Sequence, residues 1–213
     1  MPYAFALILS LTLLSGCQSA YYSAMESVGV HKRDIMVDRV EDATEAQKDA
    51  QAQFTSALAA LQSLTRFEGG TLEETYNRVN AQYEASADAA EKVSDRIAAI
   101  ENVSQALFEE WQEELSLYSS AALRRDSEAK LKATRASYGK MIAAMHRAEG
   151  KMAPVLDTLR DNSLYLKHNL NAAAIGSLQG EFRSLERDIQ RAISDMRAAI
   201  SESERFVAQL NRS

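Results

Sequence analysis

The sequence predicts an all-α protein: an elongated antiparallel bundle of four long helices with coiled-coil-like packing, after an N-terminal signal segment. Apolar residues recur alternately four and three positions apart over most of the chain, which is the heptad pattern of packed helices. Only two prolines and eight glycines interrupt the 213 residues, and these residue types disfavour helix interiors. Acidic and basic residues alternate along the chain, as they do on solvated helix faces.

The first 16 residues are typical of a secretory signal. They contain no Lys, Arg, Asp or Glu and are apolar from Tyr3 to Leu14. This stretch is too short for a membrane span, which needs roughly 20 apolar residues, and it departs from an ordinary signal only in lacking a basic residue. We therefore expect residues 1–16 to be removed during export.

The residues that follow resemble the lipobox of bacterial lipoproteins, in which small residues precede a cysteine that receives a diacylglyceryl group. The motif consists of Leu14, Ser15, Gly16 and Cys17. Cys17 is the single cysteine of the chain, so no intramolecular disulfide can form even in an oxidising periplasm. We expect residues 17–30 to be a lipidated tether, of which residues 21–29 are frayed rather than part of the core, and residues 31–213 to form one helical-bundle domain.

Four runs of heptad-spaced residues predict the four helices. The first two contain the following positions: Met36, Val40, Ala43, Gln47, Ala50, Phe54, Ala57, Leu61 and Leu64; then Leu72, Tyr76, Val79, Tyr83, Ser86, Ala90, Val93, Ile97, Ile100, Ser104, Leu107, Trp111, Glu114 and Tyr118. Thr71 and Glu74 have the spacing of a capping box at the start of the second run. Among these interior positions we expect four polar residues, Gln47, Ser86, Ser104 and Glu114.

The third and fourth runs continue the same rule. Their positions are Tyr138, Met141, Met145, Ala148, Met152, Val155, Leu159 and Leu166; then Ile175, Leu178, Phe182, Leu185, Ile189, Ala192, Met196, Ala199, Phe206 and Leu210. Ile193, Ile200 and Val207 widen the last stripe, which favours a bundle of three or four helices over a two-stranded coiled coil. A second copy of the chain could also close so broad an apolar face, so the oligomeric state stays open.

Turns are expected near 68–71, 119–126 and 169–173, and short turns make neighbouring helices antiparallel. Pro154 lies inside the third run, where its ring crowds the carbonyl of Gly150 and removes one backbone hydrogen bond. Because the heptad phase continues past Pro154, we expect a kink there and not a helix end.

Catalytic chemistry is not indicated. The sequence has no phosphate-binding glycine loop, and His31, His146 and His168 lack the ligand spacing of a zinc site. The many carboxylates fit solvated helix faces, and the net charge of −6 does not favour nucleic acid as a partner. We therefore expect no enzyme, no cofactor and no metal.

A basic stretch follows the second predicted turn and is the one candidate interaction patch. It contains Arg124, Arg125, Lys130, Lys132, Arg135 and Lys140. One interpretation is that Arg124 and Arg125 pair with Glu110, Glu113 and Glu114 across the helical hairpin. The other is that the stretch binds anionic lipid headgroups or an acidic protein.

Three segments, together with the lipobox, carry a resemblance to a known family. They are Leu117–Arg125, Arg147–Leu156 and, above all, Leu164–Ala172 continuing through Ile175–Glu181. The chain resembles the uncharacterised proteobacterial lipoprotein family called domain of unknown function 2959. The resemblance implies a helical, membrane-anchored envelope protein and supplies no reaction, ligand or catalytic residue.

The expected function is that of a nonenzymatic, lipid-anchored scaffold or adaptor of the cell envelope, held to a membrane through Cys17 and binding an envelope protein. Gln18 follows the lipidated cysteine, and by similarity to other lipoproteins the absence of Asp there suggests the outer membrane, facing the periplasm. The alternative is a periplasmic binding module, either a holdase-like chaperone or a four-helix ligand sensor.

Overall fold

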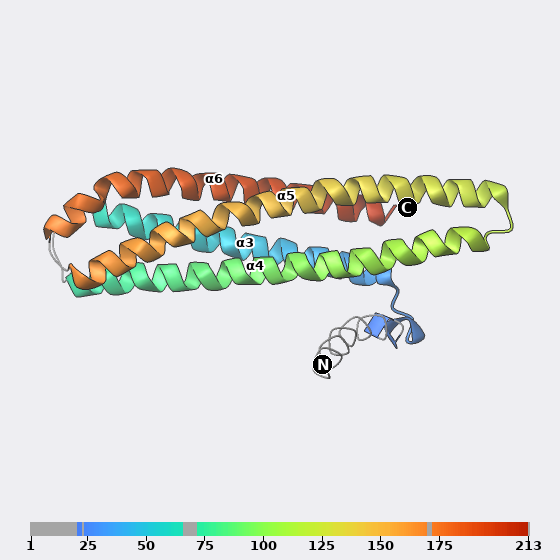
Figure 1. Ribbon diagram of the computed structural model, residues 1–213, viewed down its shortest axis with the longest axis horizontal. Helices are drawn as coiled ribbons and strands as arrows, with labels where there is room; N and C mark the ends of the chain where they lie inside the picture. Colours follow the sequence, from blue (N-terminus) through green and yellow to red (C-terminus); the bar gives the residue numbers. More distant parts are fainter. Residues whose placement is uncertain (1–20, 23, 66–71, 170–171, 213) are drawn as a thin grey trace, which may run out of the picture.

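Four long helices run side by side as an elongated rod (Figure 1). The computed structural model describes residues 21–22, 24–65, 72–169 and 172–212. The helices are α3 (Lys32–Thr65), α4 (Leu72–Glu114), α5 (Ala121–His168) and α6 (Ala172–Leu210), and the short 3-10 turn η1 (Leu115–Leu117) follows α4. The described residues contain no strand. The prediction of an all-α helical bundle is confirmed.

Each helix packs against two of the other three. Helix α3 lies against α4 and α6, and α5 lies against the same two helices, so the pairs α3–α5 and α4–α6 form the diagonals of the bundle. Neighbouring helices are antiparallel, as the short connections predicted (Figure 1). One hydrophobic core runs between all four helices.

Most of the heptad positions lie in this core. All positions of the first run from Met36 to Leu61 are buried, and so are the positions of the fourth run from Leu178 onward. The side chain of Leu64 lies outside the described part of the structure. In α5 the three methionines Met141, Met145 and Met152 are almost fully buried. Flexible thioether side chains fill irregular spaces between helices, so these methionines serve the packing of the core.

Three of the four expected interior polar residues are buried: Gln47, Ser86 and Ser104. The expectation for Glu114 is wrong, because this residue is exposed at the end of α4. The amide nitrogen and oxygen of Gln47, the hydroxyl of Ser86 and the amide nitrogen of Asn162 have no hydrogen-bond partner within the described residues. Unsatisfied polar atoms of this kind reduce the free energy of unfolding.

The turn between α4 and α5 is shorter than predicted. Helix α5 already begins at Ala121, because the Ser120 side chain accepts a hydrogen bond from the backbone N–H of Leu123 and so caps the helix. Helix α5 ends at His168 with Lys167 and His168 in its last turn, as expected for positive charge near a helix C-terminus. The predicted turn at 68–71 and the capping residue Thr71 lie outside the described residues.

Helix α5 continues through Pro154 without an end, as the heptad phase predicted. The hydroxyl of Thr158 donates to the Pro154 carbonyl at 3.0 Å. A Cβ atom added at Gly150, the residue whose carbonyl the proline ring crowds, would meet no atom within 4 Å.

The segment before α3 is attached to the bundle. Tyr22 is only 7% exposed and belongs to the hydrophobic core, and Met25 and Val30 are partly buried against that core. Glu26 forms an ion pair with Lys32. The expectation that residues 21–29 carry no core residue is therefore wrong for Tyr22. The lipobox and Cys17 lie outside the described residues.

Candidate functional site

The α4–α5 hairpin extends beyond the other two helices at one end of the rod (Figure 1). The start of α3 lies beside Glu110, because the Lys32 ammonium is 2.9 Å from the Glu110 carboxylate. The end of α6 lies at the same level, where the Arg33 guanidinium donates to the Leu210 carbonyl. Past this level the bundle is reduced to two helices and the turn that joins them.

A small cluster of side chains holds the two helices of the hairpin together. Phe108, Leu115 and Leu131 are buried against each other. The Trp111 indole Nε1 donates to the Ser127 hydroxyl at 2.8 Å. Arg135 donates to the Phe108 carbonyl at 3.0 Å, and its guanidinium lies 4.9 Å from the centre of the Phe108 ring. The hairpin therefore has its own packing beyond the main core.

The tip of the hairpin exposes large apolar side chains. Leu117 is 80% exposed, Leu123 59% and Tyr118 41%. Tyr118 continues the heptad stripe of α4 but is not buried, because α3 and α6 do not reach this level. We call Leu117, Tyr118, Leu123, Arg124 and Arg125 the hairpin tip.

The six basic residues predicted as an interaction patch differ in their contacts. Lys130 pairs with Asp126 at 3.1 Å, and Arg135 is bound to Phe108 as described above. The other four are exposed and form no ion pair with the described residues: Arg124, Arg125, Lys132 and Lys140. At 100° per residue, positions 124, 125, 132 and 135 fall within an arc of about 100° around α5.

The predicted pairing of Arg124 and Arg125 with the acidic end of α4 is not present. Glu110 binds Lys32 instead, and Glu113 and Glu114 are exposed without an ion pair among the described residues. This leaves the two arginines free for another anionic group.

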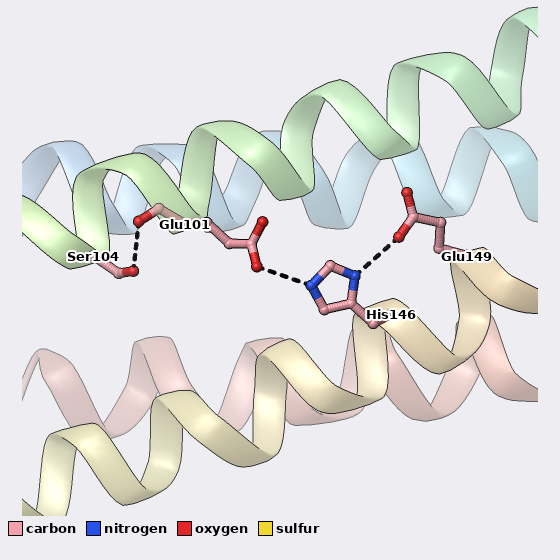
Figure 2. A network of polar contacts seen from close by, with 4 residues as sticks. All are labelled: Glu101, Ser104, His146 and Glu149. Atoms are coloured by element: carbon pink, nitrogen blue, oxygen red, sulfur yellow. Dashed lines mark hydrogen bonds and ion pairs between the residues drawn. The ribbon is translucent and has the colours of Figure 1, made fainter. Parts of the chain in front are cut away.

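A second polar feature joins α4 and α5 nearer the middle of the rod (Figure 2). The His146 ring lies between two carboxylates: its Nε2 is 2.9 Å from Glu101 Oε1, and its Nδ1 is 2.9 Å from Glu149 Oε2. The Ser104 hydroxyl donates to the backbone carbonyl of Glu101 at 2.8 Å. Hydrogen bonds to Glu101 and then to Glu149 raise the pKa of His146 above its ordinary value, against the opposing effect of burial.

The pKa of Glu149 is shifted in the opposite direction. Burial alone would raise the pKa of the Glu149 carboxyl, but hydrogen bonds with Ser94 and His146, and the charge of His146, bring it below its ordinary value. Lowered carboxyl and raised imidazole pKa values both favour the charged pair. The arrangement is thus an electrostatic link between α4 and α5.

Sequence reasoning missed this link. The separation of three residues between His146 and Glu149 was a usable signal, because such positions are neighbours on a helix. Glu101 is 45 residues away and only the packing of α4 on α5 brings it close. No group of three His, Cys, Asp or Glu side chains suited to a metal ion occurs within the described residues.

Grooves along the rod lie between neighbouring helices. One of about 470 Å³ separates α3 from α6 and is lined mainly by polar residues, among them Glu41, Lys48 and Ser203. Another of about 450 Å³ lies between α3 and α4 and includes Asp42, Asp49 and Arg96. Neither is lined by the hairpin tip or by His146.

In the described part of the chain, no helix has the length and apolar character needed to cross a bilayer.

The comparisons with known proteins identify a family. No curated protein matches the sequence. The sequence model of a family described as "Protein of unknown function (DUF2959)" matches residues 21–210. Since this match covers most of the 213 residues, the chain belongs to the DUF2959 family, as its resemblance predicted.

Proposed function

We propose that this protein is a nonenzymatic scaffold or adaptor of the cell envelope, lipid-anchored through Cys17 to the outer membrane and facing the periplasm. The anchor is supported by the apolar first 16 residues and by Leu14, Ser15 and Gly16 before the cysteine. Attachment to a membrane by this lipid requires no membrane-spanning helix.

The observation that carries the scaffold function is the continuous core of the four-helix rod. The helices have 34 to 48 residues, which corresponds to roughly 50 to 70 Å at 1.5 Å per residue. Apolar side chains of all four helices are buried in this core. A densely packed rod of this length resists bending and holds bound partners at a defined distance from its anchor.

The surface best suited to a partner is the outer face of α5. Lys132 and Lys140 are exposed and form no ion pair with the described residues. Charged groups that are not neutralised within the protein favour association with oppositely charged surfaces. The partner of this face is therefore an acidic surface of another envelope protein.

Photocrosslinking in living cells tests this function. A photoreactive amino acid is placed singly at Lys132 or Lys140, and captured proteins are identified by mass spectrometry. Matched controls carry it at Glu91 on α4 and Arg183 on α6, which are also exposed. Capture of one and the same envelope protein from α5, but not from the controls, is the expected result.

Two other results would overturn the scaffold function. Capture of many unrelated proteins from every position would favour a holdase-like chaperone. Crosslinks confined to the chain itself would mean that the basic face of α5 has no partner. The anchor is tested separately, by metabolic labelling with a palmitate analogue, which we expect to be incorporated into the protein and lost in Cys17→Ser.

A further inference from the structure

The hairpin tip combines apolar, aromatic and cationic side chains without any acid. Leu117, Tyr118 and Leu123 are exposed, and Arg124 and Arg125 follow them without ion pairs among the described residues. Residues 115–125 contain no Asp or Glu. Exposed apolar side chains that gather at one place on a protein surface mark a site of contact.

Carboxylates flank this tip on the side of the bundle. Glu113 and Glu114 precede it on α4, and Asp126 and Glu128 follow it on α5; all four are exposed. At a bilayer surface, leucine enters the acyl boundary, tyrosine lies at the level of the headgroups, and arginine reaches the phosphates. Anionic headgroups repel the carboxylates behind it, which limits insertion to the tip itself.

The tip lies at the end of the rod from which the tether leaves. Helix α3 begins beside Glu110, and Tyr118 lies eight residues further on, about 12 Å at 1.5 Å per residue. Tyr22 is held in the core, and the five Cα-to-Cα steps from Cys17 to Tyr22 span at most about 18 Å. The tether and the hairpin tip therefore lie at the same end of the rod.

We infer that the hairpin tip docks on the lipid headgroups of the bilayer that holds Cys17. The rod then stands on the membrane, and the end at which α5 is followed by α6 points away from it. The inference rests on the proposed lipid anchor. It adds a second attachment point beside the acyl chains on Cys17, and two linked contacts bind more tightly than either alone. It also leaves the outer face of α5 accessible to a protein partner.

Fluorescence from a single labelled cysteine tests this arrangement. The full chain is purified from the cell envelope, with Leu117→Cys labelled by an environment-sensitive fluorophore, and placed in vesicles of phosphatidylethanolamine and phosphatidylglycerol. Leu164→Cys, exposed near the other end of α5, is the matched control. The chain without either substitution is treated in the same way, so that any labelling at Cys17, its single cysteine, can be measured.

The expected result is a blue shift and stronger emission at position 117 and none at position 164. A further change, Leu123→Asp, should abolish the shift at 117 while the melting temperature stays unchanged, because Leu123 is exposed and outside the core. Emission typical of water at both positions would overturn the inference, and so would a shift at position 164 alone.

The experiments distinguish failure of the proposed lipid anchor from failure of the proposed docking of the hairpin tip. Without palmitate incorporation at Cys17, the proposed anchor is wrong whatever the fluorophore shows. With incorporation but no shift at position 117, only the docking of the tip is wrong. Capture of an envelope protein by a photoreactive residue at position 117 would likewise overturn docking on lipid and make the tip a protein contact.

Discussion

Nε2 of His146 on α5 lies 2.9 Å from Oε1 of Glu101 on α4. The other ring nitrogen of His146 is equally close to Glu149, so the imidazole is held on both sides (Figure 2). Because the two residues belong to different helices, the contact depends on the register in which α4 and α5 pack. The strength of this contact should change with pH, because the imidazole of His146 is charged only when it is protonated.

The first prediction concerns this pH dependence. The pKa of His146 is raised in the folded state, so its stabilisation is complete below the unfolded pKa of about 6.5 and is lost as pH rises through the folded pKa. His146 and Glu101 are 45% and 48% exposed, which limits the coupling to about 0.2–1 kcal/mol. A double-mutant cycle of His146→Gln and Glu101→Gln, measured by urea unfolding, should show coupling near pH 6 that disappears near pH 9. Equal coupling at both pH values would contradict the prediction.

The second prediction concerns the unpaired amide of Gln47. Both polar atoms of this fully buried side chain lack a hydrogen-bond partner among the described residues, and such a group costs about 1–3 kcal/mol. Gln47→Met should therefore raise the free energy of unfolding by about 1 kcal/mol or more. Gln53→Met is the control, because Gln53 donates to Gln82 at 2.9 Å and its loss should not stabilise the protein. A destabilised Gln47→Met would show that the amide has a structural role in the folded bundle.

The third prediction concerns the attachment of the two hairpin helices to each other. Trp111→Phe keeps an aromatic ring but removes the hydrogen bond to Ser127, which should cost about 0.5–1.5 kcal/mol. Amide hydrogen exchange should rise in residues 108–131 and stay unchanged around Gln47. Leu117→Ser, at an exposed position of the same hairpin, should change the stability by no more than about 0.5 kcal/mol. Uniformly faster exchange along the rod would mean that the hairpin does not open by itself.

The fourth prediction concerns the two described glycines inside α5. A Cβ atom at Gly139 or Gly150 would meet nothing within 4 Å, so alanine at either position should stabilise the helix by about 0.5–1 kcal/mol. Gly139 lies far from Pro154 and serves as the reference for Gly150, whose carbonyl the proline ring crowds. Thermal unfolding of the two variants should show similar gains. If Gly150→Ala were destabilising while Gly139→Ala was stabilising, Gly150 would be required by the proline.

Much of the fold could be predicted because the heptad spacing reports directly which face of a helix is buried. Positions such as Met36, Phe54, Met145 and Ile189 lie in the core where their spacing placed them. Helix α5 also continues through Pro154, as the unbroken heptad spacing on both sides of this residue predicted. The spacing failed at the end of α4, where Glu114 and Tyr118 fit the pattern but are exposed.

The candidate sites were less predictable, because they depend on contacts between distant parts of the chain. The basic residues of α5 could be found by composition, but the pairing expected for Arg124 and Arg125 is absent. Lys32, from the start of α3, binds Glu110 in their place. Ser120 was a usable signal for the early start of α5, since serine is a common helix cap.

The sequence by itself determined the four helices, their buried faces and their order in the chain, because these follow from local periodicity and short connections. Only the tertiary structure decided how far each helix extends past its neighbours, and therefore which apolar residues are left uncovered at the hairpin tip. It also decided that His146 meets Glu101. Both depend on the relative axial positions of the helices, which are set by the packing of all four together and not by the periodicity of any one.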